Sequence, residues 1–259
     1  MNILVVLKMV PDVVEELEIA ADGKALDAAL LRMILNERDN HALEAALLLK
    51  EKHGGKVTVL GLEAPEMDDM LFTALAKGVD RAVKVTGMEP GLSTRAAAAC
   101  LAAVIQQAGM WPADLVLTGV QAIDDLDGLA APLLAQRLGA PYAGIVTRIE
   151  PNSTGTAATV VKEYPSGVHG EFEITLPAVL GIQAAEKPPR YVPVAKVRAA
   201  MKSQKIENVA APAAEAGPVL VEVLRLEKPQ PTTHAEMLEG SPEDLAGKLC
   251  EILAGRGLL

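Results

Sequence analysis

Three carboxylates lie close together in one stretch of the sequence, 114–138, which reads DLVLTGVQAIDDLDGLAAPLLAQRL. Asp124, Asp125 and Asp127 follow a short apolar run of strand type and precede leucines at helical spacing. A strand, a tight loop and a helix N-terminus, in that order, form the usual nucleotide site of an open α/β sheet. Two other roles fit the carboxylates: Asp127 as the N-cap of the helix, which we favour, and a Mg²⁺ site, for which adjacent acids are a weak signal. The stretch therefore predicts a nucleotide site.

Signatures of common enzyme classes are missing from the chain. The sequence contains no G-x-x-x-x-G-K-[ST] phosphate loop, no G-x-G-x-x-G after a strand and no G-x-S-x-G elbow. Its histidines lie far apart, without the spacing of metal ligands: His41, His53, His169 and His234. A triad dispersed in the sequence remains open at this point. We expect a binding or carrier protein with no catalytic residues and no metal site.

Charge and hydropathy narrow the class of partner. With a formal net charge of −10 over 259 residues, the chain offers no basic stripe for nucleic acid. No uninterrupted apolar run reaches about 18 residues, so we expect no membrane insertion. The N-terminus starts directly as a strand and shows no secretory leader, and two cysteines make no disulfide framework. Cytoplasm is the expected location.

The first part of the chain alternates between strand and helix patterns. Apolar runs predict strands at 3–7, 57–62, 82–85 and 114–117. Helical spacing predicts helices at 36–53, 66–77, 93–108 and 128–138. Asn36 is the expected N-cap of the first helix, with Asp39 in a position like that of a capping box. This alternation predicts an α/β fold, a mostly parallel sheet with helices on both faces.

The pattern changes after Gly139. Short runs rich in Val, Ile and Thr predict an antiparallel extension, and one further apolar strand follows; the runs are 145–150, 156–162, 171–175 and 177–182. From 183 onward the chain is irregular, with a Pro/Ala linker at 210–218 and a well-capped helix at 242–253. We therefore divide the chain into an α/β domain, 1–182, and a C-terminal arm with a terminal helix, 183–259. So thin an arm needs a partner surface to lie on.

The basic, proline-rich segment 187–205 has two interpretations. It is either a solvated loop on an acidic protein or a docking segment. Its apolar residues Tyr191, Val192 and Val194 favour docking, because exposed apolar loops need a reason to exist.

Several motifs together resemble the β subunit of electron-transferring flavoproteins. GVQAIDD at 119–125 matches G-x-Q-A-I-D-D, and LPAV at 176–179 and PRY at 189–191 match the family's L-P-A-V and P-R-Y. The resemblance extends, in the same order along the chain, to ILVVLK at 3–8, NERDNHALEAALLLKEK at 36–52, TALAKGVDR at 73–81 and the final helix at 242–249.

The resemblance implies a single adenine-nucleotide-hydrolase-like domain in a heterodimer with an α subunit. The α subunit would hold the electron-carrying FAD, and the β subunit would bury an AMP or a second FAD. Electrons would pass between a dehydrogenase and a membrane quinone reductase or another acceptor. The family's nucleotide positions correspond here to Val6, Asn36, Leu62, Ala122, Asp125, Gly128, Leu129 and Ala130. Its partner-docking positions correspond to Arg190, Tyr191 and Val194.

The chain departs from the family where phosphate is held. The family's D-x-N-Q-T-G is replaced by LDGLAA at 126–131, so the Asn, Gln and Thr side chains are gone. Glu63 stands where the family has Gly, and a carboxylate there would repel phosphate. AMP, a second FAD or no nucleotide all remain open, as does electron bifurcation.

Two rival classes use the same architecture. One is a nucleotide-binding regulatory domain without a redox role, against which the P-R-Y segment and the final helix count. The other is an enzyme that activates a substrate with ATP, which is disfavoured because no S-G-G-x-D-S-type loop follows the first strand.

Overall fold

The computed structural model describes residues 1–87, 92–125, 127–212, 222–229 and 237–259. It divides the chain into two compact units, which are described separately here. The main unit comprises Met1–Glu18 and Leu26–Glu222, and the second unit comprises Ile19–Ala25 and Val223–Leu259. Part of the predicted linker at 210–218, together with Leu126 and His234, lies outside the described residues.

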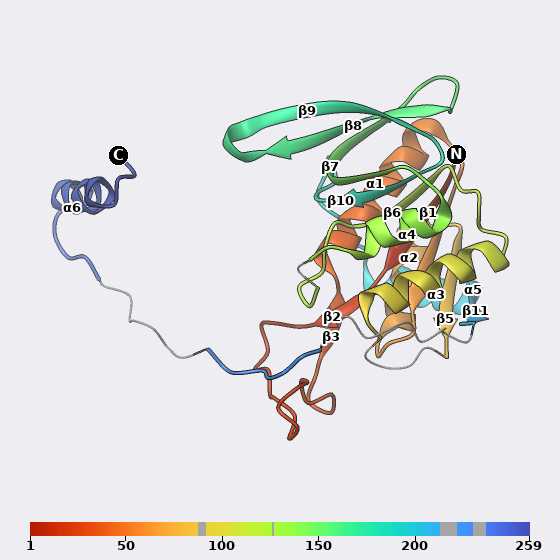
Figure 1. Cartoon of the computed structure of the whole chain (residues 1–259), viewed down its shortest axis with the longest axis horizontal. Coiled ribbons are helices and arrows are strands. Elements are labelled where there is room, and N and C mark those ends of the chain that lie inside the picture. The colour runs from red at the N-terminus through yellow and green to blue at the C-terminus, as the bar shows by residue number, and fades with distance from the viewer. Residues whose placement is uncertain (88–91, 126, 213–221, 230–236) are drawn as a thin grey trace. The chain divides into compact units, whose positions relative to one another are not determined.

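Within the described residues, the main unit is built on a nine-stranded sheet of order β11-β5-β4-β1-β6-β10-β7-β8-β9 (Figure 1). Every neighbouring pair from β11 to β7 is parallel, and β7, β8 and β9 pair antiparallel. The predicted mostly parallel sheet and its antiparallel extension are therefore confirmed. The strands are β1 (Asn2–Leu7), β4 (Lys56–Leu62), β5 (Arg81–Thr86), β6 (Leu115–Gly119), β7 (Tyr142–Pro151), β8 (Ala157–Tyr164), β9 (Val168–Thr175), β10 (Ala178–Ile182) and β11 (Ile206–Ala210).

Helices cover both faces of the sheet, as the alternating pattern predicted. One face packs against α1 (Glu37–His53), α2 (Met67–Lys77) and α5 (Val194–Ser203), and the other against α3 (Thr94–Gln107) and α4 (Ala130–Leu138). Strand β1 contributes side chains to the hydrophobic cores on both faces of the sheet. Ile3 and Val5 belong to one core, and Leu4 and Val6 belong to the other. A strand buried on both faces reads as a continuous apolar run, which is why β1 was recognisable from sequence.

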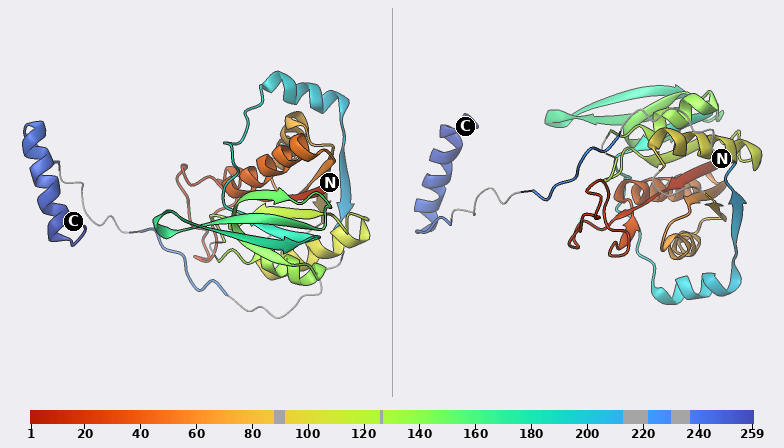
Figure 2. Two further views of the ribbon diagram at one scale, coloured as in Figure 1. Left: turned by 90° about the horizontal axis from the view of Figure 1, so that it is seen from above. Right: turned by 60° about the horizontal axis from the view of Figure 1, so that its bottom comes forward.

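The antiparallel end of the sheet extends past the helices. Figure 2 shows β8 and β9 continuing as a long hairpin, closed by the short 3-10 turn η1 (Pro165–Gly167). A separate two-stranded ribbon, β2 (Met9–Pro11) with β3 (Met33–Leu35), leads from β1 into α1. Because Asn36 N donates to Lys8 O at 2.9 Å, the start of α1 is held beside the end of β1.

The residues that directly follow 182 belong to the main unit and not to a separate arm. Helix α5 packs on α2, and β11 pairs in parallel with β5, where Arg81 and Glu207 form a bidentate ion pair. The predicted division at 182/183 therefore differs from the observed one, which carries the main unit to Glu222. The physical reason is that β11 covers the backbone edge of β5, which would otherwise be unpaired.

The second unit contains the terminal helix α6 (Pro242–Gly255). Its N-terminus is a capping box, in which Ser241 accepts from Asp244 N and the Asp244 carboxylate accepts from Ser241 N. The predicted helix start is therefore confirmed. No residue of α6 is buried within the described part of the chain, and its side chains Leu249, Ile252 and Leu253 are exposed. Across all the described ranges, no helix is long and apolar enough to cross a membrane.

Candidate nucleotide site

A cavity of about 740 Å³ opens at the carboxyl ends of β1, β4 and β6. Strand β1 lies between β4 and β6, so the chain changes winding direction at this point of the sheet. Ligands in open α/β sheets bind in such a crevice at the carboxyl ends of the strands. The volume lies within the range of small-molecule sites, roughly 300–1,000 Å³.

The walls of the cavity are mainly apolar. Apolar side chains come from the ends of β1 and β4 and from helices α3 and α4: Val6, Leu62, Ala97, Ala98, Leu101, Ala130 and Leu134. The alanines on α3 and α4 are small, and no aromatic side chain is among the described residues that line the cavity, so its interior is not filled by side chains. Such walls suit a flat heterocycle.

Seven of the eight predicted nucleotide positions line this cavity, and they come from four separate segments of the chain. They are Val6, Asn36, Leu62, Ala122, Asp125, Gly128 and Ala130. Leu129 is not part of the lining, and its side chain is 48% exposed at the N-cap position of α4. The fold thus brings together all but one of these residues, while their role in binding stays a prediction.

Asn36 and Asp39 hold the strand ends together instead of capping α1. Asn36 occupies the N-cap position but makes no capping bond; its Nδ2 donates to Gln121 O at 3.0 Å. The Asp39 carboxylate accepts from Lys8 N at 2.9 Å and from Gly119 N at 2.6 Å. The expectation of a capping box was therefore wrong, because the helix starts against the sheet and these side chains meet other amides there.

Burial raises the pKa of Asp39 to about 6, although the bonds from Gly119 and Lys8 favour its ionised form. Gly119 is required at this junction, since a Cβ there would lie 2.6 Å from Asp39 Oδ1 and 2.6 Å from Arg38 Cβ. Asp39 and Lys8 were not predicted as site residues. Their position at the carboxyl end of the first strand and the start of the first helix was the signal that could have identified them.

The loop after β6 is closed on itself by backbone bonds. Ala122 N donates to Asp125 O at 3.3 Å, and Asp125 N donates to Ala122 O at 3.0 Å. The Asp125 Oδ2 atom accepts from Thr94 Oγ1 at 2.9 Å, and Lys8 Nζ forms an ion pair with Asp124 at 2.7 Å. The chain can turn at Gly128 because its φ is +64° and a Cβ there would lie 2.6 Å from Val120 O.

The N-terminus of α4 has no side-chain cap. The N-cap position belongs to Leu129, which makes no capping bond, so the expectation that Asp127 caps this helix was wrong. The turn at Gly128 places Asp127 two residues before the N-cap position, which Leu129 occupies. Asp127 instead lines a neighbouring groove of about 450 Å³ between the loop and β7.

Glu63 is a third acidic side chain of the lining, after Asp39 and Asp125, that is held by a hydrogen bond. Its Oε2 accepts from Gly87 N at 2.9 Å, which holds the carboxylate at the end of β4. Glu63 therefore lies in the cavity wall, and its effect on phosphate stays a prediction.

The predicted docking residues are arranged around one ion-pair cluster. The Arg190 guanidinium donates to both carboxylate oxygens of Glu44 at 2.8–3.0 Å and to Glu51 at 2.6 Å. These carboxylates raise the pKa of Arg190 further above its usual range. Arg190 is thus engaged within the chain, whereas Tyr191 is 84% exposed and Val194 is 60% exposed at the start of α5.

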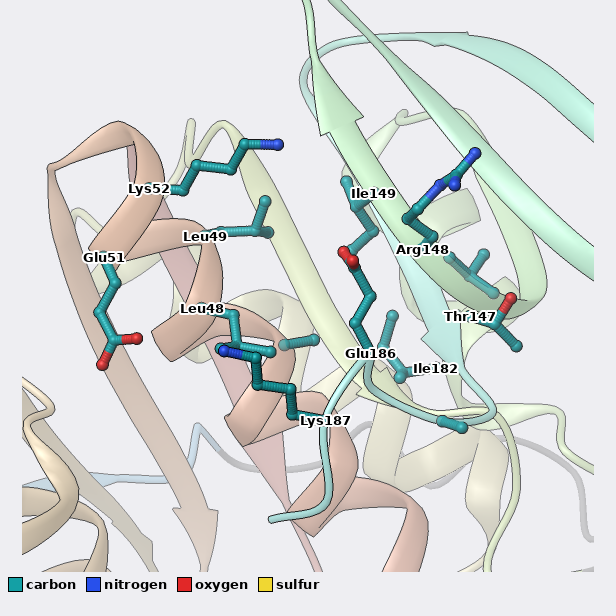
Figure 3. A pocket seen from close by; sticks show the side chains of 13 residues that line it. Leu48, Leu49, Glu51, Lys52, Thr147, Arg148, Ile149, Ile182, Glu186 and Lys187 are labelled. Carbon is teal, nitrogen blue, oxygen red and sulfur yellow. The ribbon is translucent and has the colours of Figure 1, made fainter. Parts of the chain in front are cut away.

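A second groove, of about 350 Å³, lies between α1 and β7. Figure 3 shows Leu48 and Leu49 of α1 on one side and Ile149 and Ile182 on the other. Three charged side chains of its lining are paired with residues outside the groove: Glu51 with Arg190, Lys52 with Glu150, and Arg148 with Glu171.

Among the described residues, no group of three or more His, Cys, Asp or Glu side chains could hold a metal ion. His41 Nδ1 accepts from Ala185 N at 3.2 Å, while His53 and His169 lie near Glu150 and Glu163.

The chain resembles known proteins over most of its length. Residues 26–214 match the model of the electron transfer flavoprotein domain. "Electron transfer flavoprotein subunit beta" of Syntrophomonas wolfei is 32% identical over 252 residues, covering 97% of this chain and 95% of that protein. The protein of the same name from Methylophilus methylotrophus is 29% identical, covering 98% of each. "Caffeyl-CoA reductase-Etf complex subunit CarD" of Acetobacterium woodii is 34% identical over 196 residues, 75% of this chain and 72% of that protein.

Proposed function

The chain belongs to the electron transfer flavoprotein family, and from this premise we propose that it is a β-type subunit working in a heterodimer with an α subunit. The observation that carries the proposal is the cavity at the winding change of the sheet. Seven of the eight residues that we predicted for nucleotide binding line this cavity, in a chain whose relatives are named electron transfer flavoprotein subunits.

Its function is electron transfer, as a carrier component and without a reaction of its own. The redox group is the FAD of the α subunit, and this chain shapes the surroundings of that flavin and docks redox partners. Electron transfer requires proximity and a tuned cofactor, so no acid, base or nucleophile has to be supplied by this chain. A dehydrogenase and a quinone reductase or another acceptor are the partners, and the cytoplasm is the proposed location.

The cavity is proposed as the adenine-binding site of the β subunit, at the family's position for AMP or a second FAD but with an altered phosphate loop. Its apolar walls suit the adenine ring.

The exposed residues of the C-terminal half are proposed as contact surfaces. Tyr191 and Val194 dock the redox partner, and Arg190 holds the segment that carries them. The apolar face of α6, with Leu249 and Ile252, packs on the α subunit.

Coexpression with an electron transfer flavoprotein α subunit from the same genome tests the proposal. We expect a yellow complex of one copy of each chain, whose flavin absorbance follows the heterodimer through size exclusion. A colourless, stable monomer or homodimer would instead favour a regulatory nucleotide-binding domain and overturn the proposal.

A pair of variants on α6 tests the contact with the α subunit. Leu249→Asp should weaken the heterodimer strongly, because it places a charge on the face proposed to be buried. Glu251→Gln, at an exposed polar position on the same helix, should leave assembly unchanged. Equal assembly of both variants would remove α6 from the interface.

A further inference from the structure

We propose that the cavity at the carboxyl ends of β1, β4 and β6 selects an adenine nucleoside and disfavours the phosphate of a nucleotide. That the ligand contains adenine rests on the proposed function. The inference goes beyond that function in naming an uncharged ligand, and it concerns the side chains of this chain alone.

Negative charge predominates around the cavity. Asp39, Glu63 and Asp125 line it, and Lys8 is the one cationic side chain among its described lining residues. The charge of Lys8 is already balanced by Asp124, at 2.7 Å from its Nζ. A phosphate dianion would therefore meet several carboxylates and a cation that is already paired.

The polar side chains of the lining are mostly used within the protein. Thr94 Oγ1 donates to Asp125 at 2.9 Å, Thr118 Oγ1 donates to Gly119 O at 2.7 Å, and Asn36 Nδ2 donates to Gln121 O at 3.0 Å. Each threonine hydroxyl has one hydrogen, so donating it to a phosphate oxygen would first break a bond of the fold. No such loss accompanies a neutral base and ribose that occupy the apolar space.

The start of α4 adds few donors. Its first residues, Ala130 and Ala131, carry no polar side chain, and Pro132 at the third helical position has no N–H. Two amides of the preceding loop, Ala122 N and Asp125 N, are occupied by each other's carbonyl oxygens. The helix dipole still favours an anion, but fewer amides and no side-chain hydroxyls are available to hold it.

Glu63 and Asp124 are the two groups to change. Glu63→Gln keeps an acceptor for Gly87 N, and Asp124→Asn keeps an acceptor for Lys8 Nζ, so both variants are expected to preserve the fold. Together they remove one fixed carboxylate from the wall and release the charge of Lys8 toward the cavity. The matched control is Asp68→Asn, which neutralises an exposed partner of Lys84 outside the cavity.

The test measures binding of adenosine and AMP by calorimetry, on the heterodimer or, if none forms, on the full chain. We expect adenosine to bind at least about tenfold more tightly than AMP, a difference equivalent to about 1.4 kcal/mol. The double variant should reduce the ratio of the two dissociation constants at least about tenfold, and the control should not change it. Salt should tighten the binding of AMP to the unaltered protein, because salt screens repulsion.

Several results would overturn the inference. They are AMP binding as tight as adenosine, failure of both ligands to bind, a ratio that the double variant leaves unchanged, or recovery of stoichiometric AMP or a second FAD from the denatured complex. Formation of a yellow heterodimer reports on the proposed function, so the two proposals can fail separately.

Discussion

Helix α1 carries two buried carboxylates, Asp39 and Glu44, that the protein holds in different ways. Asp39 is 5% exposed and is held by two backbone amides, at the ends of β1 and β6. Glu44 is 2% exposed and is held by the guanidinium of Arg190. Amides carry only partial charges, whereas a guanidinium carries a full charge with a geometry that matches a carboxylate.

The difference matters because the two carboxylates position different parts of the molecule. Asp39 joins the strand ends that form the floor of the cavity. Glu44 fixes Arg190, next to the exposed Tyr191 and close in sequence to Val194. Burial raises the pKa of Asp39 to about 6, while the position of the Glu44 side chain depends on Arg190.

The largest effect is expected from Arg190→Met. This change removes the guanidinium from the buried Glu44, which keeps the backbone amide of Arg190 and the field of Lys77. The free energy of unfolding at pH 7 should fall by about 3–5 kcal/mol, as expected when one partner of a buried ion pair is removed. Urea unfolding measures the loss. Arg198→Met, at an exposed position on α5, should change stability by less than about 0.5 kcal/mol. A loss below about 1 kcal/mol in Arg190→Met would show that the pair behaves as a surface ion pair.

Asp39→Asn should remove a pH dependence of similar size. The folded-state pKa of about 6 lies above the ordinary value of 3.8, so the folded protein binds more protons than the unfolded chain between these values. This contribution to stability is therefore fully present below about pH 4 and is lost as the pH rises through 6. The shift is equivalent to about 3 kcal/mol at 1.36 kcal/mol per pKa unit.

The measurement compares urea unfolding at pH 4 and pH 7. Relative to the unaltered protein, Asp39→Asn should lose about 3 kcal/mol less stability over this interval. Asp68→Asn, at an exposed ion pair, serves as the control for removal of one carboxylate. Parallel pH profiles of the unaltered protein and Asp39→Asn would show that Asp39 does not titrate in this range.

Glu51→Gln should have a small effect, although Glu51 contacts the same guanidinium. Its side chain is 58% exposed, and Arg190 keeps the buried partner Glu44. The free energy of unfolding should fall by less than about 1 kcal/mol, and less still at high salt. A loss comparable to that of Arg190→Met would mean that the two carboxylates hold Arg190 as one unit, which a double-mutant cycle would quantify.

Val194→Asp should have the smallest effect on stability and a selective effect on docking. Since Val194 is 60% exposed, its substitution should change the free energy of unfolding by less than about 0.5 kcal/mol. Turnover with the partner dehydrogenase should fall several-fold, while Ala199→Asp on the same helix should leave it unchanged. Unchanged turnover in Val194→Asp would refute docking at this position.

Most elements of the main unit were predictable because their signals are local. Continuous apolar runs marked β1, β4 and β6, and helical spacing with a terminal glycine marked α2 and α4. Strand β11 and helix α5 were missed because their sequences, IENVA and VAKVRAAMKS, are short and contain no continuous apolar run. Such segments become regular only where β5 and α2 offer an edge and a face to pack on.

The sequence predicted which residues line the candidate site, but not the hydrogen bonds and ion pairs that hold its side chains. The resemblance supplied seven residues that line the cavity, and Glu63, which stands where the family has Gly, lines it as well. The partners of Asp39 lie 31 and 80 residues away in sequence, so no local pattern distinguished a helix cap from a tie between strand ends. The same holds for Arg190, whose partners are 146 and 139 residues distant.

By itself, the sequence determined the family, the alternation of strands and helices, and the lack of an ordinary phosphate loop. These properties depend on residue type and short-range spacing, which fold into local structure in the same way wherever they occur. Only the tertiary structure decided which carboxylate meets an amide and which meets a cation, and that Lys8 is paired with Asp124 at the cavity. Charge compensation depends on distances between groups far apart in the chain, and packing alone fixes those distances.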